Sequence, residues 1–107
     1  MDRKHELEAE LARILPTLVA EYQPEAVYLY GSLATGHITS WSDIDLAIVK
    51  VTEESFYDRL ATVLRLIKPR VGMDVCVYTP QEWLILCRDR RFVREEILHK
   101  GKLLYAA

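Results

Sequence analysis

Two aspartates and a glycine-serine pair are the residues of this sequence whose types and spacing suit chemistry. Gly31 and Ser32 are followed, after ten intervening residues, by Asp43, and Asp45 lies two positions further on. Two carboxylates so placed at the start of a strand project from the same face, with Cα atoms roughly 6.5 to 7 Å apart. Like charges this close repel each other unless they are neutralised, and a pair of Mg²⁺ ions can neutralise them while binding a transferring phosphoryl group.

A third carboxylate, Asp74, interrupts an otherwise apolar run over residues 71–79. A neighbouring strand could bring it to the same point as the first two, and an unpartnered aspartate there would be costly to bury. An Asp-Ile-Asp triplet by itself is more often a solvated strand edge or a turn cap. Asp74 is therefore the residue that favours a metal site over that simpler interpretation.

The glycine-serine pair has the features of a turn that faces phosphate. Gly31 permits a sharp turn and close backbone approach, and Ser32 offers a hydroxyl and an N–H group at the first turn of a short helix. Gly36 closes the same loop. The loop lacks the Gly-Lys-Ser/Thr ending of a Walker A motif, and the chain contains no GxGxxG. The sequence thus predicts a phosphate-binding turn followed by three metal-binding carboxylates.

Hydrophobic periodicity and capping residues predict the elements that carry these side chains. Residues 7–22 form an amphipathic helix, in which Pro16 predicts a kink or a division into two short helices. Thr52 is the predicted cap of a second helix that ends before Pro69, and "TPQE" at residues 79–82 predicts the start of a third, with a break near Asp89. The predicted strands are residues 26–30, 43–51, 71–79 and 103–105.

The order helix, strand, strand, helix, strand, helix, strand predicts an α/β (α+β) fold in which helices cover a small mixed sheet. The loop between the first two strands is too short for a crossover helix, which favours an antiparallel or mixed arrangement of those two. The chain has 107 residues and half of them are hydrophobic, so we expect residues 1–107 to form a single domain.

Composition excludes several classes of function. Lys and Arg total 14 against 16 Asp and Glu, a formal charge of 14 − 16 = −2, so direct binding of duplex DNA is not expected. Cys76 and Cys87 lack metal-ligand spacing and are expected to be buried thiols. The sequence opens with no apolar leader and has no run long enough to span a membrane, so we expect a cytoplasmic protein without membrane contact.

The combination of motifs resembles the nucleotidyltransferase superfamily of DNA polymerase beta type. The residues that carry the resemblance are Gly31-Ser32, Asp43 and Asp45, and a later Asp on a strand. The segments "YLYGSLATG", "SDIDLAIV" and "REEILHKGKLLY" resemble its minimal nucleotidyltransferase branch, and the resemblance extends over about residues 7 to 105.

The resemblance implies a nucleotidyltransferase fold and a role for each site residue. Asp43 and Asp45 would hold Mg²⁺, with two ions expected, and Asp74 would join the catalytic metal and help to deprotonate the attacking hydroxyl. Gly31 and Ser32 would hold the terminal phosphates of a nucleoside triphosphate, here ATP. Members of this branch are often encoded with a helical HEPN protein as antitoxin and toxin, and some transfer AMP to a tyrosine of that partner, which is the activity we expect.

One departure from the family pattern supports a second hypothesis. The family loop frequently carries Arg where this chain has Leu33 and Thr35, and the missing cations weaken the expected grip on a triphosphate. Lys50, Lys68, Arg70 or a partner residue could compensate. The alternative function is therefore an antitoxin that has little or no activity and neutralises its partner by binding. A phospho-receiver domain needs more strand-helix units than this chain provides.

Other residues suggest how a partner or a base could be bound. "WLILC", residues 83–87, is apolar all around a helix, which predicts a surface buried in a homodimer or in a heterocomplex with a helical protein. His37 and Trp41 lie in the loop between the turn and the aspartates, where either could contact a nucleotide or simply be exposed to solvent.

Overall fold

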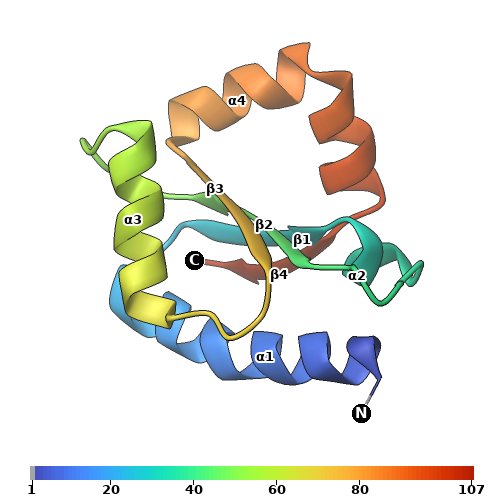
Figure 1. Cartoon of the computed structure of the whole chain (residues 1–107). Helices are drawn as coiled ribbons and strands as arrows, with labels where there is room; N and C mark the ends of the chain where they lie inside the picture. The colour runs from blue at the N-terminus through green and yellow to red at the C-terminus, as the bar shows by residue number, and fades with distance from the viewer. Residues whose placement is uncertain (1) are drawn as a thin grey trace.

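The computed structural model describes residues 2–107, whose strands form a four-stranded sheet with helices on both faces (Figure 1). The strands are β1 (Ala26–Tyr30), β2 (Ile44–Val49), β3 (Met73–Tyr78) and β4 (Lys102–Ala106). The helices are α1 (Arg3–Thr17), α2 (Ser32–Thr35), α3 (Phe56–Ile67) and α4 (Pro80–Asp89), together with the π-helical segments η1 (Leu18–Tyr22) and η2 (Val93–His99).

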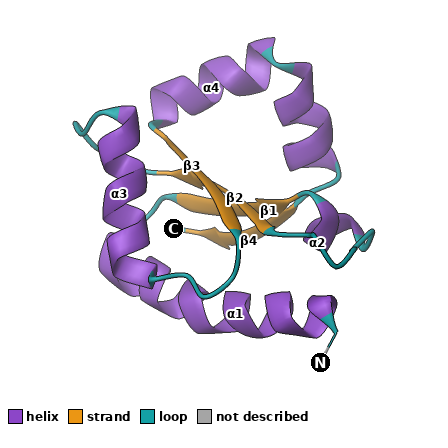
Figure 2. Ribbon diagram, viewed as in Figure 1, coloured by secondary structure: helices purple, strands orange, loops and turns teal. Residues whose placement is uncertain are grey.

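The sheet has the strand order β3-β2-β1-β4 and mixed directions (Figure 2). β1 is antiparallel to both β2 and β4, whereas β2 is parallel to β3 and is joined to it through α3. The predicted α/β class with a small mixed sheet is confirmed, as is the antiparallel arrangement of the first two strands. β2 lies inside the sheet, which agrees with the apolar density of its sequence.

The two faces of the sheet pack against different helices. Ile44, Leu46 and Ile48 of β2 contribute to the larger core, which α1, η1 and α3 cover. Ala47 and Val49 point the other way, into a smaller core that α4 and η2 cover, and these two helical segments arch over the sheet on the side opposite α1 (Figure 1). Successive side chains of β2 thus point alternately into the two cores. By the same alternation, Asp45 lies on the face of the sheet that α4 and η2 cover.

The structure divides the first helical stretch close to Pro16. α1 continues through Pro16 to Thr17, and the chain then changes to the wider π-helical turns of η1. Proline has no N–H group to donate to the preceding turn, and the irregular turns follow directly after it. The apolar residues of the predicted stripe still reach the core, because Leu7, Ile14 and Leu18 are buried.

The starts of α3 and β2 are among the other boundaries that differ from the sequence-based prediction. Ser55 caps α3 by accepting a hydrogen bond from the Asp58 N–H, whereas the Thr52 hydroxyl accepts from the Glu54 N–H and closes a turn inside the loop. Both residue types form such bonds equally well, so the sequence alone does not choose between them. β2 begins at Ile44, one residue later than predicted, and Asp43 therefore precedes the strand.

The start of α4 is as predicted. Thr79 and Glu82 form a capping box with Pro80 in the first turn, and the break near Asp89 appears as the end of α4. Glu82 also accepts a hydrogen bond of 2.7 Å from Arg59 of α3, whose guanidinium is buried and donates to the Val77 carbonyl of β3. α3, β3 and α4 are thereby joined at one point.

Two further features of the fold concern its cysteines and the lengths of its helices. Cys76 and Cys87 are both free thiols and partly buried. Among residues 2–107, no helix is long and apolar enough to cross a membrane.

Candidate active site

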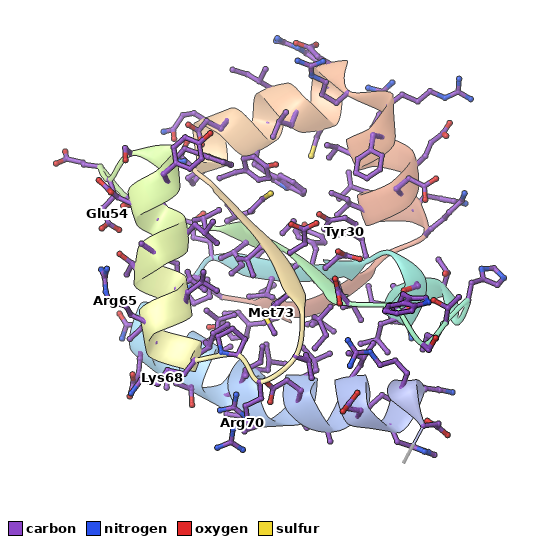
Figure 3. The ribbon with its side chains drawn as sticks, viewed as in Figure 1. Tyr30, Glu54, Arg65, Lys68, Arg70 and Met73 are labelled. Atoms are coloured by element: carbon purple, nitrogen blue, oxygen red, sulfur yellow. The ribbon has the colours of Figure 1, made fainter. Side chains whose placement is uncertain are left out.

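The pairing of the strands brings Asp45 beside Asp74. The two residues are direct partners in the parallel pairing of β2 with β3, and on the other side of β2 Asp45 is the partner of Tyr30. Neighbouring strands lie about 4.7–4.9 Å apart, and paired residues project from the same face. The two carboxylates and the tyrosine ring therefore form one row across the sheet, on the side that η2 covers. Figure 3 shows Tyr30 on this side. The centroid of its ring is 6.1 Å from the centroid of the Phe92 ring, and the two rings pack edge to face.

The electrostatics of this row show that negative charges are gathered there. Burial raises the pKa of Asp45 to about 6, and the carboxylates of Asp74 and Asp43 add to the effect. Burial likewise raises the pKa of Tyr30 to about 12, with contributions from Cys76, Asp45 and Asp74. A carboxylate such as Asp45, whose pKa is raised by burial and neighbouring negative charge, is one that a bound cation would stabilise in its ionised form.

The Gly31 turn lies directly against Asp45. Gly31 has φ 76° and ψ −157°, a backbone conformation open mainly to glycine, and a Cβ atom added there would collide with the Asp45 carboxylate. α2 begins at the next residue, Ser32, and its first turn is closed by the Ala34 and Thr35 N–H groups, which both donate to the Gly31 carbonyl. The predicted phosphate-binding turn and the central carboxylate are thus in contact.

Asp43 is held from two other directions. A Cβ atom at Gly72, just before β3, would overlap the Asp43 carboxylate, so the strand start passes close by it. On the open side, Arg3 of α1 donates from Nη2 to Asp43 Oδ1 at 3.4 Å and from Nε to the Ser42 carbonyl at 2.8 Å. The Asp43 side chain is about half exposed (51 %). The first turn of α1 therefore reaches the candidate site.

The three aspartates share one end of β2 and β3, but their side chains do not all converge. Asp45 and Asp74 are neighbours, whereas the Asp43 carboxylate faces Gly72 and Arg3. In the part of the chain that the structure describes, no three acidic, His or Cys side chains are close enough to form a ready metal site. The donor set still suits a hard divalent cation, because it consists of carboxylate oxygens on a turn and at strand starts, where Asp43 and Asp74 are exposed and can rotate.

The residues of the loop have different surroundings. Leu33 is buried in the larger core, so a side chain at this position faces away from the carboxylates, while Thr35 is exposed. His37 is exposed, and Trp41 has 88 % of its surface accessible. Lys50, one of the cations expected to compensate for the missing arginines, follows the opposite end of β2 and donates to the Tyr22 carbonyl at the end of η1.

Sequence reasoning missed Arg3 and Gly72 as neighbours of the site. Arg3 is 40 residues away from Asp43 along the chain, and no local pattern connects the two. The only signal for Gly72 is its position two residues before Asp74, at the start of a strand where glycine is unfavourable without a reason.

Comparison with known proteins agrees with this fold. The model of the polymerase beta nucleotidyltransferase family matches residues 10–107, and the chain belongs to that family. This confirms the resemblance drawn from the sequence to nucleotidyltransferases of DNA polymerase beta type. Nucleotidyl transfer is therefore the general class of reaction to which this family belongs.

Solved structures provide two comparisons. A candidate nucleotidyltransferase from Sulfolobus solfataricus is 23% identical, with a TM-score of 0.67, and the match covers 96% of this chain and 83% of that one. This likeness shows a shared fold. A toxin-antitoxin structure with AMP-PNP is 16% identical, with a TM-score of 0.42, and the match covers 98% of this chain and 74% of that one. None of the curated proteins matches this chain.

Proposed function

We propose that this chain is a minimal nucleotidyltransferase domain over residues 1–107 that transfers AMP from ATP to a tyrosine hydroxyl of a HEPN-type toxin, and so acts as its antitoxin. The observation that carries the proposal is the contact between the Gly31 turn and Asp45, which is the paired neighbour of Asp74. A turn with free N–H groups beside grouped carboxylates suits a triphosphate and its counter-ions. Such a reaction belongs where ATP is abundant, in the cytoplasm.

Each residue of the site has a role in this proposal. The carboxylates of Asp43, Asp45 and Asp74 would hold two Mg²⁺ ions. Gly31 and Ser32 would receive the terminal phosphates through the backbone and hydroxyl of the turn. When bound, Mg²⁺ would neutralise triphosphate charge and make pyrophosphate a better leaving group.

The transfer itself is a displacement at phosphorus. The phenolic oxygen of the acceptor bonds to the α-phosphorus as the bond from that phosphorus to the α,β-bridging oxygen breaks, and pyrophosphate leaves. The phenol loses its proton to the Asp74 carboxylate, which is exposed and beside the half-buried Asp45. Asp45 stays in place because it is fixed between two strands and the Gly31 turn. Orientation of the two reactants thus supplies a large part of the rate enhancement.

A protein acceptor fits the exposed apolar surface of α4. Leu84 and Ile85 have 71% and 52% of their surfaces accessible, while Trp83 between the helix and the sheet is buried. Isolated apolar side chains are common on protein surfaces, but two large adjacent ones on a helix are a reasonable contact for a helical partner. The HEPN partner and a heterocomplex rest on the resemblance together with this surface.

A specific observation favours the second candidate function, which is neutralisation of the partner by binding alone. The segment from residue 31 to residue 49 contains no Lys or Arg, so the turn itself has no cation for a triphosphate. Leu33 is in the core, which leaves Thr35 as the loop position where an exposed cation is missing. A binder with this fold would still form the complex.

Intact-mass spectrometry distinguishes the two functions. The co-purified partner, or a candidate HEPN protein, is incubated with this chain, ATP and Mg²⁺. AMP transfer with loss of pyrophosphate adds about 329 Da for each group transferred. The increment should disappear with Asp43→Ala and with Asp45→Ala, but persist with Asp58→Ala, which removes an exposed carboxylate from the first turn of α3. A stable complex without any added mass would contradict transfer and leave neutralisation by binding.

A further inference from the structure

Arg3 contacts the candidate site from a part of the chain that the family model does not match. The family match begins at residue 10, whereas Arg3 is the first residue of α1. Its side chain is 23% exposed, less than the 51% of the Asp43 side chain with which it pairs. The guanidinium is thus the more buried member of the pair.

Every arm of the Arg3 guanidinium has its own acceptor. Nε donates to the Ser42 carbonyl at 2.8 Å, Nη1 to the Glu6 carboxylate, and Nη2 to Asp43 Oδ1 at 3.4 Å. Ser42 is itself buried, and its hydroxyl accepts from the Thr39 N–H at 2.9 Å, so the anchor on this loop is rigid. The planar fork of an arginine then fixes the direction in which Nη2 points.

We propose that Arg3 is a positioning residue that holds the Asp43 carboxylate by one oxygen at this end of the sheet, so that the other oxygen is available to a metal ion. Arg3 engages Oδ1, and the Gly72 backbone closes the same side of the carboxylate, which leaves Oδ2 for a divalent cation. This inference rests on the proposed function, in which Asp43 is a metal ligand. Hydrogen bonds that orient ligating carboxylates are worth 10–100-fold in metal affinity.

The positive charge of Arg3 acts in the opposite direction, because a cation beside a metal site repels the metal. Glu6 offsets this charge, since its carboxylate pairs with Arg3 at the same time as Asp43 does. Orientation of Asp43 is therefore the effect that remains. Arg3→Lys would keep the positive charge but lose the planar guanidinium. This substitution therefore separates the effect of the charge from the effect of orienting Asp43.

The test is isothermal titration of the full chain with Mn²⁺, without nucleotide. Arg3→Gln and Arg3→Lys should each weaken Mn²⁺ binding by about 10–100-fold. Lys4→Gln, which removes the same charge from the next residue of α1, should change the affinity by less than about twofold, because a solvent-exposed charge is screened. Thermal unfolding of each variant sets a titration temperature at which all are folded, so a role in stability alone would leave the affinity unchanged.

A second variant tests the role of Arg3 in metal binding without altering Arg3 itself. Glu6→Gln removes the negative charge that offsets Arg3 but keeps an oxygen that can accept from Nη1, so it should weaken Mn²⁺ binding less than Arg3→Gln, since the Ser42 anchor also remains. Unchanged or tighter binding by Arg3→Gln, together with a loss of binding in Asp43→Ala, would overturn the inference and leave the proposed metal site intact. Absence of binding by the wild-type chain, or binding unaffected by Asp43→Ala, would overturn the proposed site and the inference together.

Discussion

Gly31→Ala is the substitution whose effect can be worked out most fully from the structure. The backbone at Gly31, with φ 76° and ψ −157°, lies in a region that residues with a side chain essentially do not adopt. The added methyl group would also overlap Oδ2 of Asp45, which is fixed between β1 and β3. Two separate penalties therefore fall on one residue.

The two penalties can be given separate magnitudes. Strain in this region costs about 1–3 kcal/mol, and forcing a methyl group into a packed position costs about 1–3 kcal/mol more. Gly31→Ala should thus reduce the free energy of unfolding by about 2–6 kcal/mol. Gly36 is the matched control, because it also has a positive φ of 86° but nothing lies within 4 Å of an added Cβ atom. Gly36→Ala should cost about 1–2 kcal/mol, from strain alone.

A double-mutant cycle in urea isolates the collision. The free energy of unfolding is measured for the wild type, Gly31→Ala, Asp45→Ala and the double variant, with Gly36→Ala beside them. Removing the Asp45 side chain relieves the overlap but not the strain, so the double variant should be more stable than the sum of the single changes predicts, by about 1–3 kcal/mol. A cost for Gly31→Ala no greater than for Gly36→Ala, with no coupling to Asp45, would refute the contact between the turn and the carboxylate.

Three further predictions concern charged side chains, each measured by urea unfolding of the metal-free chain. Burial and neighbouring carboxylates raise the pKa of Asp45 to about 6, so Asp45→Asn should stabilise the fold above pH 6 and lose this advantage as the pH falls toward 4. The hydrogen bond from Arg13 lowers the pKa of Glu10, so Glu10→Gln should cost about 1.5–3 kcal/mol at pH 7, and the difference from wild type should shrink as the pH falls through the lowered pKa. Glu82→Gln leaves the buried Arg59 without its charged partner and should cost about 1.5–3 kcal/mol, with faster amide exchange in α4.

Each of these three has a result that would contradict it. Asp45→Asn should not be less stable than wild type at pH 7.5, since that would mean that the carboxylate is favourably placed. A Glu10→Gln penalty that stays constant from pH 7 to pH 3 would show that its charge is not the source of stability. Amide exchange in α4 that stays as slow as in wild type would exclude Glu82 as the residue that fixes the start of this helix.

The boundaries of helices and strands were predicted best where the local sequence allowed only one interpretation. The strand at residues 26–30 was predicted with its observed bounds, because Gly31 ends an apolar run. The capping box at Thr79 was likewise predicted, since three residues at fixed offsets all favour the same helix start. The cap of α3 was assigned to Thr52 instead of Ser55, because a hydroxyl before a helix has several possible backbone partners and the packing of the helix decides among them.

The candidate site was predictable in its residue types but not in its side-chain directions. Asp45 and Asp74 depend on strand pairing, which the apolar runs around them imply. The direction of the Asp43 side chain depends on Arg3, which lies 40 residues away in the sequence. This ion pair results from the packing of α1 beside the sheet, and no sequence pattern near either residue predicts it.

Paramagnetic broadening by Mn²⁺ in the ¹H–¹⁵N spectrum of the chain is the measurement that addresses the proposed site most directly. Mn²⁺ is added in substoichiometric steps, first alone and then with a non-hydrolysable ATP analogue. Amide signals of residues 31–33, 43–45 and 72–74 should broaden first, because the Gly31 turn lies against Asp45, and the analogue should increase this broadening. Broadening centred on the acidic residues of α1 or α3 instead, or equal broadening in Asp45→Ala, would contradict a metal and nucleotide site at this end of the sheet.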